Sequence, residues 1–219
     1  MKVLLLGARG RMGQKMQKYL SDNNIEFLGV DVDDRKLANG YPADVIIDFS
    51  TAAALYDNLN LACKKQLPIV VATTGHDDKA LQLIEHHSLH IPILLASNLS
   101  IQFNVLCELT KHLSVLNGNQ FVISEVHHKY KKDAPSGSAK QLIATLSNIN
   151  ILPQVYSVRA GDVIGEHTLT IYGEGEQLVI SHTSTDRLVY CKGALTCAEY
   201  LLDKKSGLFT MRDIIKNDC

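Results

Sequence analysis

Near its start the chain reads Lys2-Val-Leu-Leu-Leu-Gly-Ala-Arg-Gly-Arg-Met-Gly13, and the pattern of this segment indicates the fold class. The apolar run Val3–Leu6 is typical of a parallel strand that is buried on both faces. Glycines at positions 7, 10 and 13 follow it, and the apolar residues at 12, 16, 19 and 20 then predict a helix that stops at Asn23-Asn24. A strand that passes through a glycine turn into a helix is the beginning of a βαβ unit.

The glycine turn is a candidate ligand site. Glycine permits the tight bend, and it lets backbone N–H groups approach a pyrophosphate at the positive end of a helix. Asp31 lies 18 residues beyond Gly13, at the end of the next expected strand, where a carboxylate can accept hydrogen bonds from an adenosine ribose. Together these features predict dinucleotide binding, whereas each taken singly also fits a structural turn or a solvated carboxylate.

The choice between NADH and NADPH stays open. Asp31 favours a ribose without a phosphate, because a 2′-phosphate would meet its negative charge. Arg9, Arg11 and Arg35 can offset such a phosphate. We therefore expect NADH, NADPH or both as the cofactor.

Strands and helices continue to alternate up to about residue 100. Strands are expected at 27–32, 45–49, 69–72 and 93–96, with a helix over 79–87, a helix capped by Ser50 or Thr51, and only a turn or two of helix between Val32 and Asp44. Thr73-Thr74-Gly75 and Ser97-Asn98 end strands at the carboxyl edge, where such sheets bind ligands, although ordinary turn chemistry also explains them. The alternation predicts an α/β fold with a doubly wound parallel sheet.

The pattern changes after Asn98. Helices are expected over 102–116 and 136–146, a strand over 121–126, and strands of alternating character at 156–159, 167–172 and 178–183, with a turn at Gly173-Glu-Gly175. A last helix is expected over 194–202. We predict a dinucleotide-binding domain in residues 1–100, to which the tail 193–219 returns. A second α+β domain with a mixed sheet is expected in residues 101–192.

Composition excludes several classes of protein. With 46% hydrophobic residues, 21% charged residues and a formal net charge of −1, nothing points to nucleic acid or a membrane as a partner. The apolar run after Lys2 stops at Gly7, which is too short for a signal peptide. Five scattered cysteines argue against a disulfide scaffold and a structural zinc site, and they favour the reducing cytoplasm. These are Cys63, Cys107, Cys191, Cys197 and Cys219.

The densest chemistry lies in Glu125-Val-His-His-Lys-Tyr-Lys-Lys-Asp-Ala-Pro-Ser-Gly-Ser138. Adjacent His127 and His128 on a strand face opposite sides, and no third ligand stands at a suitable spacing, so we expect no metal site. Histidine titrates near neutral pH, Lys131 supplies positive charge or a proton, and a helix start at 136–138 offers N–H groups to a carboxylate. The segment indicates an anion-binding acid–base site or, more simply, a solvated charged loop.

This segment resembles the signature Glu-x-His-His-x-x-Lys-x-Asp-x-Pro-Ser-Gly-(Ser/Thr) of the 4-hydroxy-tetrahydrodipicolinate reductases, formerly called dihydrodipicolinate reductases, of the diaminopimelate route to lysine. The similarity extends over essentially the whole chain, including Gly7–Gly13, Asp48-Phe49-Ser50, Arg159–His167 and the tail Gly207–Asp213. The chain departs from the family pattern near the cofactor, at Ala72, Leu99 and Gln102.

The resemblance implies the NAD(P)H-dependent reduction of 4-hydroxy-tetrahydrodipicolinate, a small dicarboxylate, by a homotetramer. Its first domain would be Rossmann-like, and its second domain would serve substrate binding and oligomerisation. The resemblance makes His127 the proton donor or acceptor and Lys131 the proton donor. It implies substrate contacts for His128, Ser136, Gly137 and Ser138. It implies cofactor contacts for Gly7, Ala8, Arg9, Gly10, Arg11, Met12, Gly13, Asp31, Ala72, Thr73, Thr74, Ser97, Asn98, Leu99 and Ser100.

Two other functions fit the glycine turn by itself. One is a dehydrogenase of another small amino or keto acid, and the other is a non-catalytic regulator that binds NAD(P). Neither function explains the His-His-x-x-Lys segment, so that segment argues against both.

Overall fold

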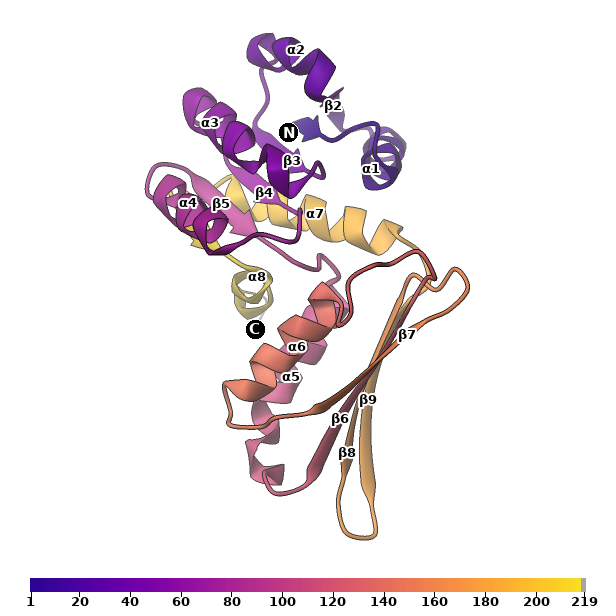
Figure 1. Ribbon diagram of the computed structural model, residues 1–219. Helices are drawn as coiled ribbons and strands as arrows, with labels where there is room; N and C mark the ends of the chain where they lie inside the picture. Colours follow the sequence, from indigo (N-terminus) through magenta and orange to yellow (C-terminus); the bar gives the residue numbers. More distant parts are fainter. Residues whose placement is uncertain (218–219) are drawn as a thin grey trace. The chain divides into compact units, whose positions relative to one another are not determined.

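The computed structural model describes residues 1–217, which form two compact units (Figure 1). The first unit comprises Met1–Leu99 and the described part of Leu188–Cys219, and the second comprises Ser100–Arg187. The segment 188–192 thus belongs to the first unit rather than to the second. Within residues 1–217, no helix combines the length and the apolar character needed to cross a bilayer.

The first unit is built on a six-stranded sheet with the order β10-β5-β4-β3-β1-β2, in which all neighbouring strands run parallel. The strands are β1 (Lys2–Leu6), β2 (Glu26–Val30), β3 (Val45–Asp48), β4 (Ile69–Val71), β5 (Pro92–Leu95) and β10 (Gly207–Phe209). The helices are α1 (Arg11–Asp22), α2 (Arg35–Gly40), α3 (Leu55–Lys65), α4 (Asp78–Ser88), α7 (Leu188–Leu201) and α8 (Met211–Asn217), with short 3₁₀ turns at Val32–Asp34 and Ala52–Ala54.

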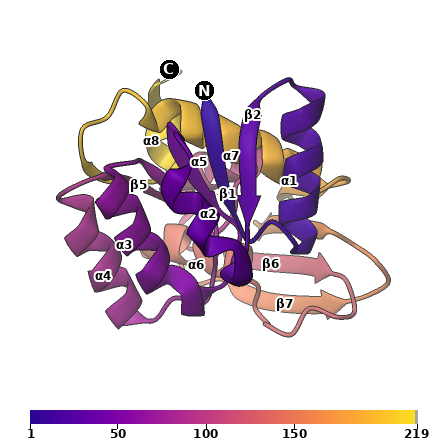
Figure 2. The same cartoon turned by 90° about the horizontal axis from the view of Figure 1, so that it is seen from above.

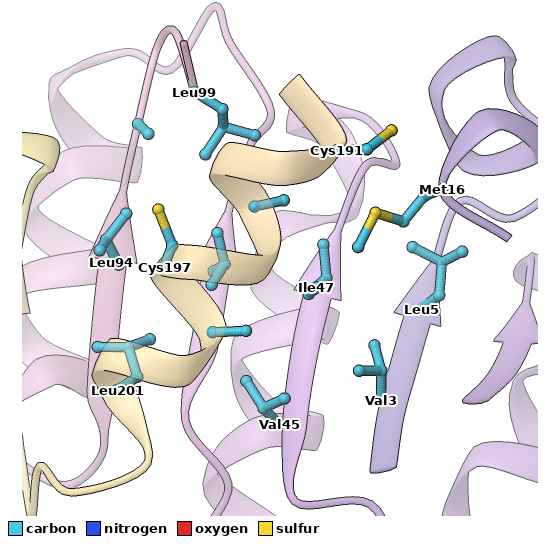
Figure 3. Packing of buried hydrophobic residues seen from close by; sticks show 14 of the residues in the cluster. Val3, Leu5, Met16, Val45, Ile47, Leu94, Leu99, Cys191, Cys197 and Leu201 are labelled. Carbon is cyan, nitrogen blue, oxygen red and sulfur yellow. The ribbon is translucent and has the colours of Figure 1, made fainter. Parts of the chain in front are cut away.

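Both faces of this sheet are covered. Alternate residues of β1 point to opposite faces, so Val3 and Leu5 pack with α1 and α7, whereas Leu4 and Leu6 pack with α2, α3 and α4. Figure 2 shows α3 and α4 on the opposite side of the strands from α7. Side chains of α7 lie over β3, β4 and β5, as the close view of the core shows (Figure 3). This arrangement explains why the strands of this unit are continuous apolar runs.

Several local predictions for the first unit were wrong. Neither Ser50 nor Thr51 caps the following helix through its side chain, because the Ser50 hydroxyl and N–H both donate to Asp48. Helix α7 begins at Leu188, six residues before the predicted start at Ala194. Gly193 does not stop the helix; it allows close packing, since a Cβ there would lie 1.8 Å from the carbonyl oxygen of Leu99. The short strand β10 and helix α8 were not predicted.

The second unit carries a four-stranded mixed sheet with the order β7-β6-β8-β9. Strand β6 pairs parallel with β7 and antiparallel with β8, and β8 pairs antiparallel with β9. Its elements are α5 (Ile101–Thr110), a 3₁₀ turn (Lys111–Leu116), β6 (Gln120–His127), α6 (Gly137–Ser147), β7 (Gln154–Arg159), β8 (Gly165–Tyr172) and β9 (Gln177–Ser184).

The predicted fold class, a doubly wound parallel sheet plus a second mixed sheet, is confirmed. The segment predicted as a helix over 102–116 is α-helical over Ile101–Thr110 and continues as the 3₁₀ turn to Leu116. The change falls at Thr110, whose hydroxyl donates to the carbonyl of Cys107. Such a bond to the preceding turn competes with the helical pattern. No disulfide joins the four cysteines within residues 1–217, and Cys219 lies outside those residues.

Candidate active site

The turn between β1 and α1 needs glycine at two of its positions. Gly7 has a φ of +78°, and a Cβ there would lie 2.6 Å from the backbone of Phe49 and Ser50. A Cβ on Gly13 would lie 2.1 Å from the carbonyl oxygen of Gly7. Gly10, by contrast, has only that oxygen nearby, at 3.3 Å, and as the N-cap of α1 it offers no side-chain cap. The turn therefore leaves an open approach to the start of α1, which suits a pyrophosphate.

Acidic residues gather where β2 ends, next to this turn. Asp31 accepts a hydrogen bond from the backbone N–H of Arg9 at 2.6 Å. The guanidinium of Arg9 forms ion pairs with Asp33, at 3.1 Å, and with Asp34. Two of the arginines considered as partners of a 2′-phosphate are thus engaged elsewhere, because Arg35 bonds to Asp57 and Asn58. A pocket lined by Gly7, Asp31 and Arg35, among others, opens beside the turn.

The other predicted cofactor residues follow β4 and β5. Thr73 is buried, and its hydroxyl lies 3.0 Å from Nε2 of His76. Ala72 and Thr74 flank it in the same loop. Ser97 and Asn98 follow β5, and Leu99 packs into the core with α7, so a ligand could meet only its backbone (Figure 3). In the second unit, Ser100 caps α5 by accepting a bond from Phe103, and its hydroxyl lies 3.1 Å from Nε2 of His182.

Strand β6 places Glu125 and His127 on one face, because side chains two residues apart on a strand point the same way. That face is the buried one: Glu125 is 0% exposed and His127 is 7% exposed. Nδ1 of His127 contacts Oε2 of Glu125. A side-chain pair of this kind can hold an imidazole in one orientation.

Arg159, at the end of the neighbouring strand β7, forms an ion pair with Glu125. Its Nη2 donates to Oε1 of Glu125 at 2.8 Å and to the carbonyl of Asp133 at 2.5 Å. The backbone N–H of Ser136 also donates to Oε1, at 3.2 Å. Burial by itself would raise the pKa of Glu125, but the bond from Arg159, with those from Ser157 and His127, lowers that pKa to about 2. Glu125 is therefore a carboxylate at neutral pH.

Two further histidines extend the cluster across the sheet. The His167 ring on β8 lies 5.1 Å from that of His127, and the His182 ring on β9 lies 6.2 Å from that of His167, measured between centroids. Both ring nitrogens of His167 are buried without a hydrogen-bond partner. Burial, reinforced by His127 and His182, lowers the pKa of His167 to about 3, so this ring is neutral.

The loop after β6 brings Lys131 and the start of α6 to the same place. Nζ of Lys131 pairs with Asp133 at 2.9 Å, and its charge is close enough to contribute to the lowered pKa of His127, of which burial is the main cause. Ser136 is the N-cap of α6 and accepts a bond from the N–H of Ala139. Gly137 and Ser138 form the first turn of that helix. His128 follows the strand and is half-buried, with its ring 6.4 Å from that of Tyr130.

The sequence did not reveal part of this cluster. The sequence indicated Glu125 only as a member of the motif. Its spacing of two residues from His127 on a strand would have predicted that the two side chains lie on the same face. Arg159, His167 and His182 come from later strands, and only strand pairing brings them in. Among the described residues, ligand atoms of Glu125, His127 and His167 all lie within 4.8 Å of one another. This group does not include His128, so it is not a site shared by the two adjacent histidines, and the absence of a metal stays a prediction. Since the Glu125 oxygens already bond to Arg159 and His127, we assign Glu125 as their ion-pair partner.

Comparisons with known proteins cover both units. Residues 1–99 match the family model for the N-terminus of dihydrodipicolinate reductase, and residues 100–215 match the model for its C-terminus. The 4-hydroxy-tetrahydrodipicolinate reductase of Bdellovibrio bacteriovorus is 36% identical, covering 98% of this chain and 96% of its own. The enzyme of that name from Zymomonas mobilis is 34% identical, again covering 98% of this chain and 96% of its own.

A solved structure shares the fold. It is the dipicolinate-bound dihydrodipicolinate reductase of Paenisporosarcina sp. TG-14, with a TM-score of 0.77 and 21% sequence identity. The alignment covers 96% of this chain and 97% of that one. At this identity the likeness establishes the architecture, and the roles of single residues have to be argued from their own geometry.

Proposed function

Because this chain belongs to the dihydrodipicolinate reductase family, we propose that it reduces 4-hydroxy-tetrahydrodipicolinate to tetrahydrodipicolinate with NADH or NADPH, in the diaminopimelate route to lysine. The observation that carries the proposal is the convergence of His127, Lys131 and the start of α6 on one buried ion-pair cluster. This grouping combines proton transfer with anion binding, and both are needed to reduce a cyclic dicarboxylate.

The residues of the first unit fit a dinucleotide. The glycine turn would hold the pyrophosphate at the N-terminus of α1, and Asp31 would accept hydrogen bonds from the ribose. Ala72, Thr73, Thr74 and Ser97–Ser100 would complete the cofactor contacts. When bound, the nicotinamide supplies the hydride; the substrate loses water and takes up one proton in the same overall reduction.

The residues of the second unit would orient the substrate and move its protons. The N–H groups of Gly137 and Ser138 at the start of α6, the Ser136 hydroxyl and His128 would bind a substrate carboxylate. Lys131 would pair with that carboxylate and donate a proton, while Nε2 of His127 would exchange a proton with the substrate. The first unit thus serves as the dinucleotide-binding domain and the second as the substrate domain.

Replacing Lys131 tests the proposal. Lys131→Ala should lower turnover by about 10²–10⁴-fold while leaving the affinity for NADH unchanged, because the lysine acts on the substrate. Turnover is followed as oxidation of NADH and NADPH with enzymatically generated substrate, and affinity by fluorescence titration. Lys129→Ala, two positions away in the same loop, is the matched control and should keep full turnover. Unchanged turnover in Lys131→Ala would contradict the assignment.

The same assay separates the alternatives. Oxidation of the nicotinamide with another amino or keto acid, but not with this substrate, would indicate a different dehydrogenase. Cofactor binding without oxidation of either nicotinamide would indicate a regulator.

The enzyme is further proposed to be a cytoplasmic homotetramer. The outer face of the second sheet supports an assembly, because Tyr156, Val158, Tyr172 and Val179 lie on it with 45–56% of their surface exposed. Light scattering coupled to gel filtration would give the mass of the assembly, and cell fractionation would give its compartment. Val179→Glu should dissociate the tetramer if this face forms the interface.

A further inference from the structure

We propose that Glu125 and Arg159 are positioning residues that fix His127 as the tautomer with its proton on Nδ1 and an unprotonated Nε2. The inference rests on the proposed function, because His127 is the residue whose chemistry the pair would prepare. Neither Glu125 nor Arg159 is assigned a contact with substrate or cofactor. Their effect on the reaction would pass through the imidazole.

The hydrogen bond between Glu125 and His127 determines the tautomer. A carboxylate has no proton to donate, so Nδ1 of His127 must be the donor in this contact. A neutral imidazole carries one proton, and with that proton on Nδ1 the lone pair is left on Nε2. A Cβ on Gly165, the first residue of β8, would lie only 3.2 Å from that nitrogen, so the glycine keeps a side chain out of the space beside Nε2. Nε2 is therefore the atom that can exchange a proton with a ligand.

Arg159 keeps Glu125 ionised and in place. Its guanidinium bridges Oε1 of Glu125 and the carbonyl of Asp133, and its Nη1 donates to the carbonyl of Val158. Asp133 in turn pairs with Lys131 through its side chain. Arg159 thus joins the strand that carries His127 to the loop that carries Lys131. A bridge of this kind fixes the two proposed proton carriers relative to one another.

The titratable and charged groups that face His127 come from three strands and a loop. Glu125 lies on β6 itself, Arg159 on β7, His167 on β8, and Lys131, paired with Asp133, in the loop after β6. Burial lowers the pKa of His127, Lys131 and Arg159 lower it further, and Glu125 raises it. Loss of the Glu125 charge should consequently lower the pKa of His127 still more, and it should release the ring from one tautomer.

Nitrogen-15 NMR of the histidine rings tests the inference directly, with the His127 signals identified by their loss in His127→Asn. In the unaltered enzyme at neutral pH, the shifts should show a protonated Nδ1 and an unprotonated Nε2. In Glu125→Gln both tautomers should be populated, because the amide can either donate or accept. In Glu125→Asp, which keeps the carboxylate, the original tautomer should predominate again.

Kinetics of the same variants show the consequence. Glu125→Gln should lower kcat on the order of 10²-fold, the lower end of what a general acid–base group contributes, with an unchanged KM for NADH. The acid limb of its pH profile should move to lower pH, and Glu125→Asp should restore part of both. Glu166→Gln is the matched control, because Glu166 lies on the opposite face of the sheet, and it should match the unaltered enzyme. Arg159→Lys should show a smaller loss than Glu125→Gln.

The outcomes are separable. A proton on Nε2 in the unaltered enzyme would overturn the inference, and this measurement needs no variant to fold. An unchanged tautomer in Glu125→Gln would overturn it as well, whatever the activity. A lost tautomer with full turnover would instead overturn the proposed role of His127, and with it the catalytic consequence of the pair.

Discussion

The glycine turn (Gly7–Gly13) and the histidine cluster (Glu125, His127, Arg159 and His167) are built on opposite principles. The glycine turn is one continuous stretch of chain, and backbone atoms that tolerate no Cβ determine its shape. The histidine cluster is assembled from three strands, and contacts between charged and polar side chains hold it. We therefore expect the glycine turn to lose its structure when atoms are added, and the histidine cluster to do so when a charge is removed or introduced.

The largest effect is expected from a methyl group added to the glycine turn. Gly13→Ala places a Cβ 2.1 Å from the carbonyl oxygen of Gly7, so the backbone must shift, and we expect a loss of about 3 kcal/mol in the free energy of unfolding. Urea unfolding followed by circular dichroism measures it. Gly10→Ala is the control: its Cβ meets that oxygen only at 3.3 Å, so it should stay stable and weaken NADH binding instead. Equal losses in the free energy of unfolding of Gly13→Ala and Gly10→Ala would show that the contact between a Cβ and the carbonyl oxygen of Gly7 does not determine the stability of the turn.

A charge introduced into the histidine cluster by acid gives the second effect. The pKa of His167 is about 3 in the folded protein against an ordinary value of 6.5, so below pH 6.5 the unfolded chain takes up a proton that the folded chain refuses. The free energy of unfolding should therefore decrease as the pH falls below 6.5, and at about pH 5 it should be about 2 kcal/mol lower than at neutral pH. Urea unfolding at neutral pH and at about pH 5 measures this loss.

The control for that experiment is His167→Gln, which has no proton to take up at this position. Any constant cost of the substitution cancels when the two pH values are compared within one variant. The unaltered protein should lose about 2 kcal/mol more than the variant between these pH values. Equal losses in the free energy of unfolding of the two proteins would show that protonation of His167 does not cause the destabilisation.

The smallest effect is expected from the charges beside the glycine turn, where a change of charge should alter the choice of cofactor and not the stability of the fold. Asp33→Asn with Asp34→Asn removes two negative charges and frees Arg9, so kcat/KM for NADPH should rise about tenfold relative to NADH. Asp22→Asn, which breaks an exposed pair with Lys18 on α1, is the control and should leave the ratio unchanged. An unchanged ratio in the double variant would show that these acids do not set cofactor preference.

The sequence predicted the two regions unequally, for a physical reason. The glycine turn depends on local backbone geometry, so the run Val3–Leu6, the glycine spacing and Asp31 were enough to predict it. The histidine cluster depends on strand register: His127 faces Arg159 on β7, and Glu125 faces His167 on β8. Those partners are fixed by the order β7-β6-β8-β9, which no local pattern specifies. The early start of α7 escaped prediction for a similar reason, since Gly193 is explained by its packing against Leu99.

The return of α7 to the first unit has a consequence for synthesis of the chain on the ribosome. Its side chains cover one face of β3, β4 and β5, yet it is translated only after the whole of residues 100–187. The second unit is continuous and can complete its core during translation. The nucleotide-binding unit cannot complete its core until α7 has been translated. Until then, the apolar face formed by Val45, Ile47 and Leu94 stays uncovered. Its surface is most open to chaperones and to aggregation in that interval.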